Sequence, residues 1–180
     1  GYLAQLYYFQ GEYQKAIRQF ETILSLDPLN AHVMSILGSL YLDVGETEKA
    51  QDILQETLEI DPDQDAALNA LGYLYAEQGV NLDEAEALVK KALEIDPDNG
   101  AYLDSLGWVY YQQGQYQTAL EYLNKANSFL KDPVIYEHLG NVYLKLGKKE
   151  KARKYWQLSL ELLPEQESIR TKIKTLDSND

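Results

Sequence analysis

The sequence repeats itself with a period of about 34 residues. A small residue, a tyrosine, a glycine, an alanine and a proline recur in that order along most of the chain. The small residue stands at Ala4, Gly38, Gly72, Gly107 and Gly140, in steps of 34, 34, 35 and 33 residues. Positions that recur with the same spacing over this length predict one structural unit that is repeated along the chain. Each unit of this kind buries its apolar face against the neighbouring units.

Each column has a physical reason in a pair of antiparallel helices. Apolar residues within the segments, such as Ala50, Leu54 and Leu58, follow the helical period. The small residue lets the two helices approach closely, and the tyrosine three positions later lies on the same helical face. The glycine after it adopts positive φ at low cost and ends the first helix, and the proline closes the second. A helical bundle without repeats would not keep this register, so we predict an all-α chain of helical hairpins.

These columns resemble the tetratricopeptide repeat family, whose unit is a helix–turn–helix of about 34 residues with this pattern. The resemblance covers residues 1–164 and implies a right-handed α-solenoid of five repeats with a C-terminal capping helix. We expect residues 1–180 to form a single array. The expected repeats are 1–29, 30–64, 65–99, 100–132 and 133–164, and the capping helix is 165–176.

The chain departs from the family pattern in three places. The third repeat has one extra residue around Val80 and Asn81, and the fourth is one residue short, with Lys131 in the proline column. The first repeat lacks about four initial positions, counted against the family repeat. This truncation places Gly1 inside a helix and indicates a fragment of a longer protein.

The charge of the chain is uneven, and this constrains its partners. Residues 1–99 hold 19 acidic and 5 basic residues (net −14), and residues 100–180 hold 10 acidic and 11 basic residues (net +1). An acidic surface repels phosphate backbones, so we expect a neutral or basic protein or peptide partner and no nucleic acid. No apolar run reaches the length of about 18 residues that a transmembrane helix needs.

The sequence contains no catalytic or metal-binding motif. Cysteine is absent, and His32 and His138 fall in separate repeats without a second ligand at helical spacing. We expect both histidines to be exposed or half-buried. The prediction is therefore a protein without enzymatic activity, catalytic residues, metal or cofactor.

The family resemblance implies a concave groove lined by the first helix of each repeat, and four columns of residues map onto it. The expected partner-binding residues are Gln5, Tyr8, His32, Ser35, Ser39, Asn69, Tyr73, Asp104, Trp108, Tyr111, Glu137 and Asn141. Small or aliphatic residues complete the columns at Leu42, Ala66, Ala76, Ala101, Val134 and Leu144.

Aromatic residues stand out within these columns. Tyr73, Trp108 and Tyr111 are expected to lie near one another and partly exposed. Tyr75 and Tyr110 already occupy the buried tyrosine column, and a helical rotation of about 200° over two residues turns Tyr73 and Trp108 away from it. Amphipathic rings of this kind are favoured at binding hot spots. The alternative is that they pack against neighbouring repeats. Asp104 and Glu137 make one column acidic, which argues against the Lys- and Arg-based clamp that some members of the family use to grip a C-terminal carboxylate.

A basic cluster begins the second helix of the last repeat. Its residues are Lys148, Lys149, Lys151, Arg153 and Lys154. Such a cluster is either a solvated helix face or a contact with an acidic partner, an anionic membrane surface or the acidic front of a second copy.

These features predict an interaction scaffold that binds a peptide or protein segment in the groove. Two alternatives are a self-assembling array that stacks acidic front to basic rear and a regulatory module of a larger enzyme. The stretch Leu82–Tyr111 is similar to bacterial cell-envelope repeat proteins, which favours the periplasm or envelope over the cytoplasm.

Overall fold

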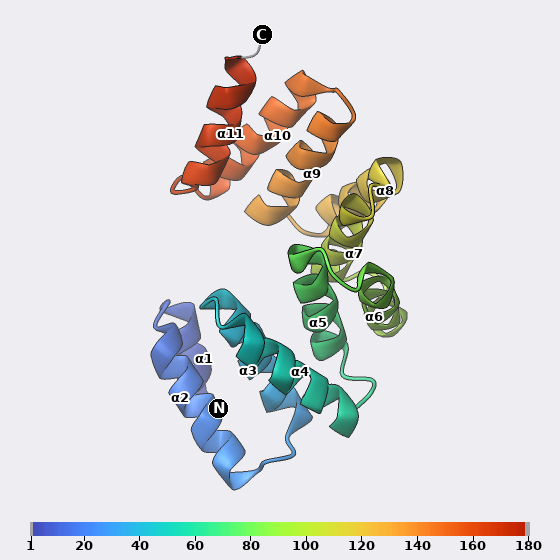
Figure 1. Ribbon diagram of the computed structural model, residues 1–180. Coiled ribbons are helices and arrows are strands. Elements are labelled where there is room, and N and C mark those ends of the chain that lie inside the picture. Colours follow the sequence, from blue (N-terminus) through green and yellow to red (C-terminus); the bar gives the residue numbers. More distant parts are fainter. Residues whose placement is uncertain (1, 179–180) are drawn as a thin grey trace. The chain divides into compact units, whose positions relative to one another are not determined.

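The computed structural model describes residues 2–178, and within this range every regular element is an α-helix (Figure 1). The helices are α1 (Tyr2–Phe9), α2 (Tyr13–Leu26), α3 (Ala31–Asp43), α4 (Thr47–Ile60), α5 (Asp65–Gln78), α6 (Leu82–Ile95), α7 (Gly100–Gln112), α8 (Tyr116–Phe129), α9 (Pro133–Lys145), α10 (Lys149–Leu162) and α11 (Glu167–Asp177). The all-α prediction is confirmed. The expectation that Gly1 is helical lies outside the described residues.

Successive helices pair as hairpins: α1 with α2, α3 with α4, α5 with α6, α7 with α8, and α9 with α10. The helices group into two compact units, Gly1–Asp96 and Pro97–Asp180, called here the N-terminal unit and the C-terminal unit. The first helix of each hairpin ends one or two residues before its glycine, as the repeat predicts. The single continuous array of repeats stays a prediction.

The small-residue column lies where paired helices cross. A Cβ atom added at Gly38 would stand 2.6 Å from the Leu54 side chain, so any larger residue would force the packing to shift. The alanine column faces this crossing from the second helix and is fully buried in every repeat, at Ala16, Ala50, Ala85, Ala119 and Ala152. The close approach expected from the sequence is therefore confirmed.

The extra residue of the third repeat is absorbed in the α5–α6 turn. Gly79 caps α5 with a φ of +67°, as the glycine of a helix C-terminus does. Asn81 follows with a φ of +48°, the only positive φ at a non-glycine residue within the described range. Asparagine tolerates this left-handed conformation better than most residues, so the added position costs little.

Helix α11 packs against α10 and seals the end of the C-terminal unit. Ile169 is fully buried and Leu176 is almost so, whereas Arg170 and Lys174 are exposed. This confirms the predicted capping helix, which begins two residues later than expected.

Candidate functional site

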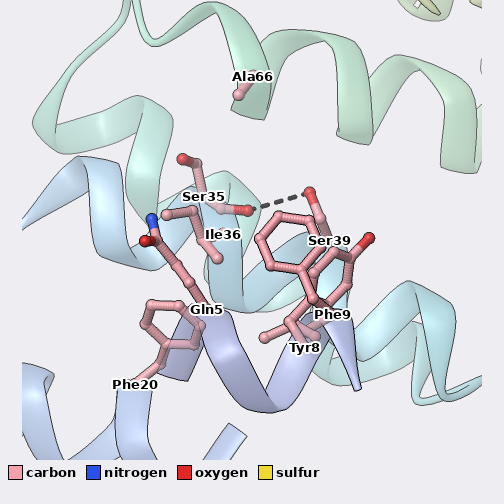
Figure 2. A pocket seen from close by; sticks show the side chains of 9 residues that line it. Gln5, Tyr8, Phe9, Phe20, Ser35, Ile36, Ser39 and Ala66 are labelled. Atoms are coloured by element: carbon pink, nitrogen blue, oxygen red, sulfur yellow. Dashed lines mark hydrogen bonds between the residues drawn. The ribbon is translucent and has the colours of Figure 1, made fainter. Parts of the chain in front are cut away.

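The first helices of the hairpins border a pocket of about 420 Å³ in the N-terminal unit, called here the N-terminal pocket. Its lining residues are Gln5, Tyr8, Phe9, Phe20, Ser35, Ile36, Ser39, Leu40 and Ala66. Five of these, Gln5, Tyr8, Ser35, Ser39 and Ala66, belong to the groove columns expected from the sequence. Figure 2 shows the α1 and α3 side chains gathered around this pocket.

The N-terminal pocket is mostly apolar. The Ser39 hydroxyl donates to the carbonyl of Ser35 at 3.2 Å, and the Ser35 hydroxyl donates to the carbonyl of His32 at 2.9 Å (Figure 2 draws the first bond). Both hydroxyl protons are therefore used within α3. Tyr8 is 40% exposed, so part of its side chain is available to a ligand.

The N-terminal pocket lies beside Asp43 in a strongly acidic unit. Burial, together with the charge of Asp43, raises the pKa of the Tyr8 hydroxyl, and burial raises the pKa of the Asp43 carboxyl against its hydrogen bond from Tyr8. Residues 1–96 hold 18 acidic and 5 basic residues, a net charge of −13. A cationic ligand is favoured in this field and an anionic ligand is repelled.

A second pocket, of about 620 Å³, lies in the C-terminal unit and is called here the C-terminal pocket. Residues of α7, α9 and α11 line it together with two residues of α10. They are Trp108, Tyr111, Asn141, Leu144, Lys145, Lys149, Trp156, Thr171, Lys172, Thr175 and Leu176. The expected groove residues Trp108, Tyr111 and Asn141 are thus brought together here.

Trp108 is only 9% exposed, so the expectation of a partly exposed ring is wrong. Its ring stacks with Tyr111, at 4.6 Å between centroids, and with His138, at 4.1 Å. Helical rotation does turn Trp108 away from the tyrosine pocket of its own repeat, but α9 of the next repeat covers that face. Tyr73 and Tyr111 are half-buried, and the closeness of Tyr73 to the other two rings stays a prediction.

His138 and Asp104 form a buried pair that the sequence reasoning missed. The Nδ1–H of His138 donates to the two carboxylate oxygens of Asp104 at 2.9 and 3.1 Å. Both side chains are buried, so the expectation of an exposed or half-buried His138 is wrong. The carboxylate of Asp104 is likewise buried and is not presented to a partner in a groove. The two residues are 34 positions apart, which is one repeat, and this spacing could have predicted that they lie side by side in adjacent repeats.

The capping helix engages two further groove residues. The Lys172 ammonium donates to Glu137 at 2.6 Å and to Asn141 at 3.0 Å, and the Trp156 indole N–H also donates to Asn141 at 3.3 Å. Of the remaining candidates, His32 is exposed outside the N-terminal pocket, and Asn69 is half-buried.

The basic cluster does not form one continuous face. Lys149 lines the C-terminal pocket, Lys151 lies over the Tyr143 ring at 5.3 Å, and Arg153 pairs with Glu150 at 3.0 Å. Lys148 and Lys154 are exposed. Only part of the cluster can therefore meet a single partner surface.

Replacing Asp104 with alanine is expected to lower the free energy of unfolding by about 1–2 kcal/mol, because the buried Nδ1–H of His138 loses its acceptor. Urea denaturation followed by circular dichroism measures this loss. Asp98→Ala serves as the control, since the Asp98 side chain is exposed and lies 3.9 Å from its nearest lysine. Equal stability of the two variants would show that the Asp104–His138 bond contributes nothing.

The described residues hold no group of three or more histidine, cysteine, aspartate or glutamate side chains placed to bind a metal ion. Among the same residues, no helix has the length and apolar character needed to cross a membrane.

Comparisons with known proteins agree with this architecture. Family models described as tetratricopeptide repeat match residues 7–72, 63–132 and 133–166. A TPR protein of Thermus thermophilus is similar in structure, with a TM-score of 0.79 at 22% identity over 97% of this chain and 95% of that one. PilW, a type IV pilus biogenesis factor, gives a TM-score of 0.78 at 22% identity, over 98% of this chain and 84% of the PilW chain.

PilF of Pseudomonas aeruginosa is 31% identical over 83% of this chain and 68% of its own, with a TM-score of 0.68. A search of curated proteins finds no significant match. Tetratricopeptide repeats generally mediate protein–protein interactions, and proteins built from them are typically scaffolds without enzymatic activity. The repeat matches, the paired helices and these structural relatives together show that the chain belongs to the tetratricopeptide repeat family.

Proposed function

We propose that the chain is a protein-interaction module that binds a peptide segment of a partner protein in the N-terminal pocket. One observation supports this most directly: groove positions of α1, α3 and α5, separate in sequence, line one open space. Its volume of about 420 Å³ lies within the range of ligand pockets in proteins. The space accepts a bulky apolar side chain, and the half-open Tyr8 ring would be its anchor.

The negative charge of the N-terminal unit favours basic residues on either side of the apolar residue of the bound segment. Basic residues beside the apolar anchor would be attracted to Asp43 and to the net negative charge of this unit, and the attraction would weaken as salt is added. The similarity to PilF and PilW supports a place in the bacterial envelope for this module.

Panning a random-peptide phage library against the full chain tests this function. We expect enriched peptides with an apolar residue flanked by lysine or arginine. Tyr8→Ala is expected to weaken their binding about tenfold, because it removes the half-exposed ring that they contact. Fluorescence anisotropy of the synthesised peptides measures the change.

Tyr2→Ala is the matched control, because Tyr2 lies on the same helix, is 84% exposed and does not line the pocket. Ser39→Leu fills the pocket without removing the Tyr8 contact and should also weaken binding. Equal binding by the wild-type chain, Tyr8→Ala and Ser39→Leu would rule out the N-terminal pocket as the binding site.

A further inference from the structure

The C-terminal pocket has an aromatic floor and a cationic rim. Trp108 and Trp156 are both at least nine-tenths buried, and they form the floor with Leu176. Lysines reach the rim from three elements: Lys145 ends α9, Lys149 begins α10, and Lys172 lies within α11. No carboxylate is among the lining residues whose side chains the structure describes.

Two hydrogen-bond donors of this pocket, on Trp108 and Lys145, have no acceptor among the described residues. The indole N–H of Trp108 is buried and has no acceptor among the described residues. Lys145 is exposed and pairs with no carboxylate whose position is described. Asn141 is a nearby acceptor, but its oxygen already receives Lys172 and Trp156. A ligand with oxygen acceptors would satisfy the buried indole N–H, and a carboxylate would bond most strongly to the lysine ammonium.

We propose that the C-terminal pocket is a second binding site, which takes an acidic segment of a partner protein in which carboxylate side chains stand beside bulky apolar ones. The apolar side chain would cover the indole floor, and a carboxylate beside it would meet Lys145. Lys149 and Lys172 add positive charge beside Lys145, although Lys172 is itself paired with Glu137. Because this charge comes from three separate elements, it suits carboxylates spaced along a segment better than one chain terminus. This site goes beyond the proposed function: it lies in the other unit and has the opposite charge preference.

The protein carries its own reporter for this site. Its sequence contains two tryptophans, and both line the C-terminal pocket. A ligand that covers the floor or approaches the Trp108 N–H changes the polarity around these indoles. Intrinsic tryptophan fluorescence of the full chain therefore follows binding at this pocket and not at the N-terminal pocket, whose lining has no tryptophan.

The test titrates the chain with a short acetylated and amidated peptide carrying glutamate–leucine pairs, and with the same peptide carrying glutamine for glutamate. Blocked ends ensure that only side-chain carboxylates bring negative charge. We expect saturable tryptophan fluorescence changes with the glutamate peptide and binding at least about tenfold weaker with the glutamine peptide.

Two variants with the same change of charge locate the site. Lys145→Gln should weaken the glutamate peptide about three- to tenfold, whereas Lys148→Gln, exposed just outside the lining, should change it less than about twofold. Tyr8→Ala and Ser39→Leu should leave it unchanged, which separates failure of this site from failure of the N-terminal pocket.

Four results would overturn the inference. The glutamine peptide could bind equally well, which would make the site a purely apolar one. Lys148→Gln could weaken binding as much as Lys145→Gln, which would indicate unspecific attraction to the basic cluster. Sedimentation could reveal a dimer that Lys145→Gln dissociates, which would make the occupant the acidic N-terminal unit of a second copy. Absence of any fluorescence change would equally exclude an acidic ligand.

Discussion

Replacing Trp156 with alanine is expected to lower the free energy of unfolding by about 3–5 kcal/mol, as large aromatic truncations in a core do. The side chain is 1% exposed and fills the space that Gly140 leaves open, since a Cβ atom added at Gly140 would lie 2.3 Å from the indole. Removing the indole leaves a cavity between α9 and α10 and also removes its bond to Asn141. Urea denaturation followed by circular dichroism measures the loss.

Phe129→Ala is the control for Trp156→Ala, because the Phe129 ring belongs to the same unit and is 50% exposed. Its removal should cost less than about 1 kcal/mol, as is usual for a surface substitution. If both variants unfold at the same urea concentration, Trp156 does not hold α10 against α9.

Leucine at Gly107 or at Gly72 is expected to lower the free energy of unfolding by about 2–3 kcal/mol or more, through overpacking between paired helices. A Cβ atom at Gly107 would lie 2.7 Å from Leu123, and one at Gly72 would lie 2.6 Å from Val89. At Gly72 the Ala85 carbonyl oxygen is also only 3.0 Å away. Backbone cannot yield as a side-chain end can, so we expect Gly72→Leu to melt at the lower temperature.

Ala101→Leu adds a comparable side chain on the exposed face of α7, the helix that carries Gly107. The stability of this control should stay within about 0.5 kcal/mol of the wild type. Thermal melts of the three variants compare them directly. Unchanged melting for both glycine variants would mean that the small-residue column does not lie at a tight crossing.

The sequence was sufficient to predict every hairpin and the capping helix, because the repeat acts through local backbone chemistry. Glycine ends a helix, and a small residue permits a crossing, wherever the period places them. Gln5, Tyr8, Ser35 and Ser39 likewise fall together because the repeat fixes which face of each first helix they occupy.

The environment of each groove residue was less predictable, because it depends on side chains of the neighbouring hairpin. Trp108 is covered by His138, which stands one position beyond the groove column that contains Glu137. Glu137 itself is reached by Lys172 of the capping helix, where the repeat pattern has ended. Neither contact can be predicted from the helical rotation within a single repeat.

The pairing of helices with their sequence neighbours also bears on how fast the chain folds. Within each unit, the main helix contacts join elements one or two places apart in the chain, such as α3 with α4 and α3 with α5. Only short loops must close before these contacts form, so the search through chain conformations is brief. Folding can therefore start at any hairpin and spread to the next, and a defect at one crossing slows the spread locally while the other hairpins still form.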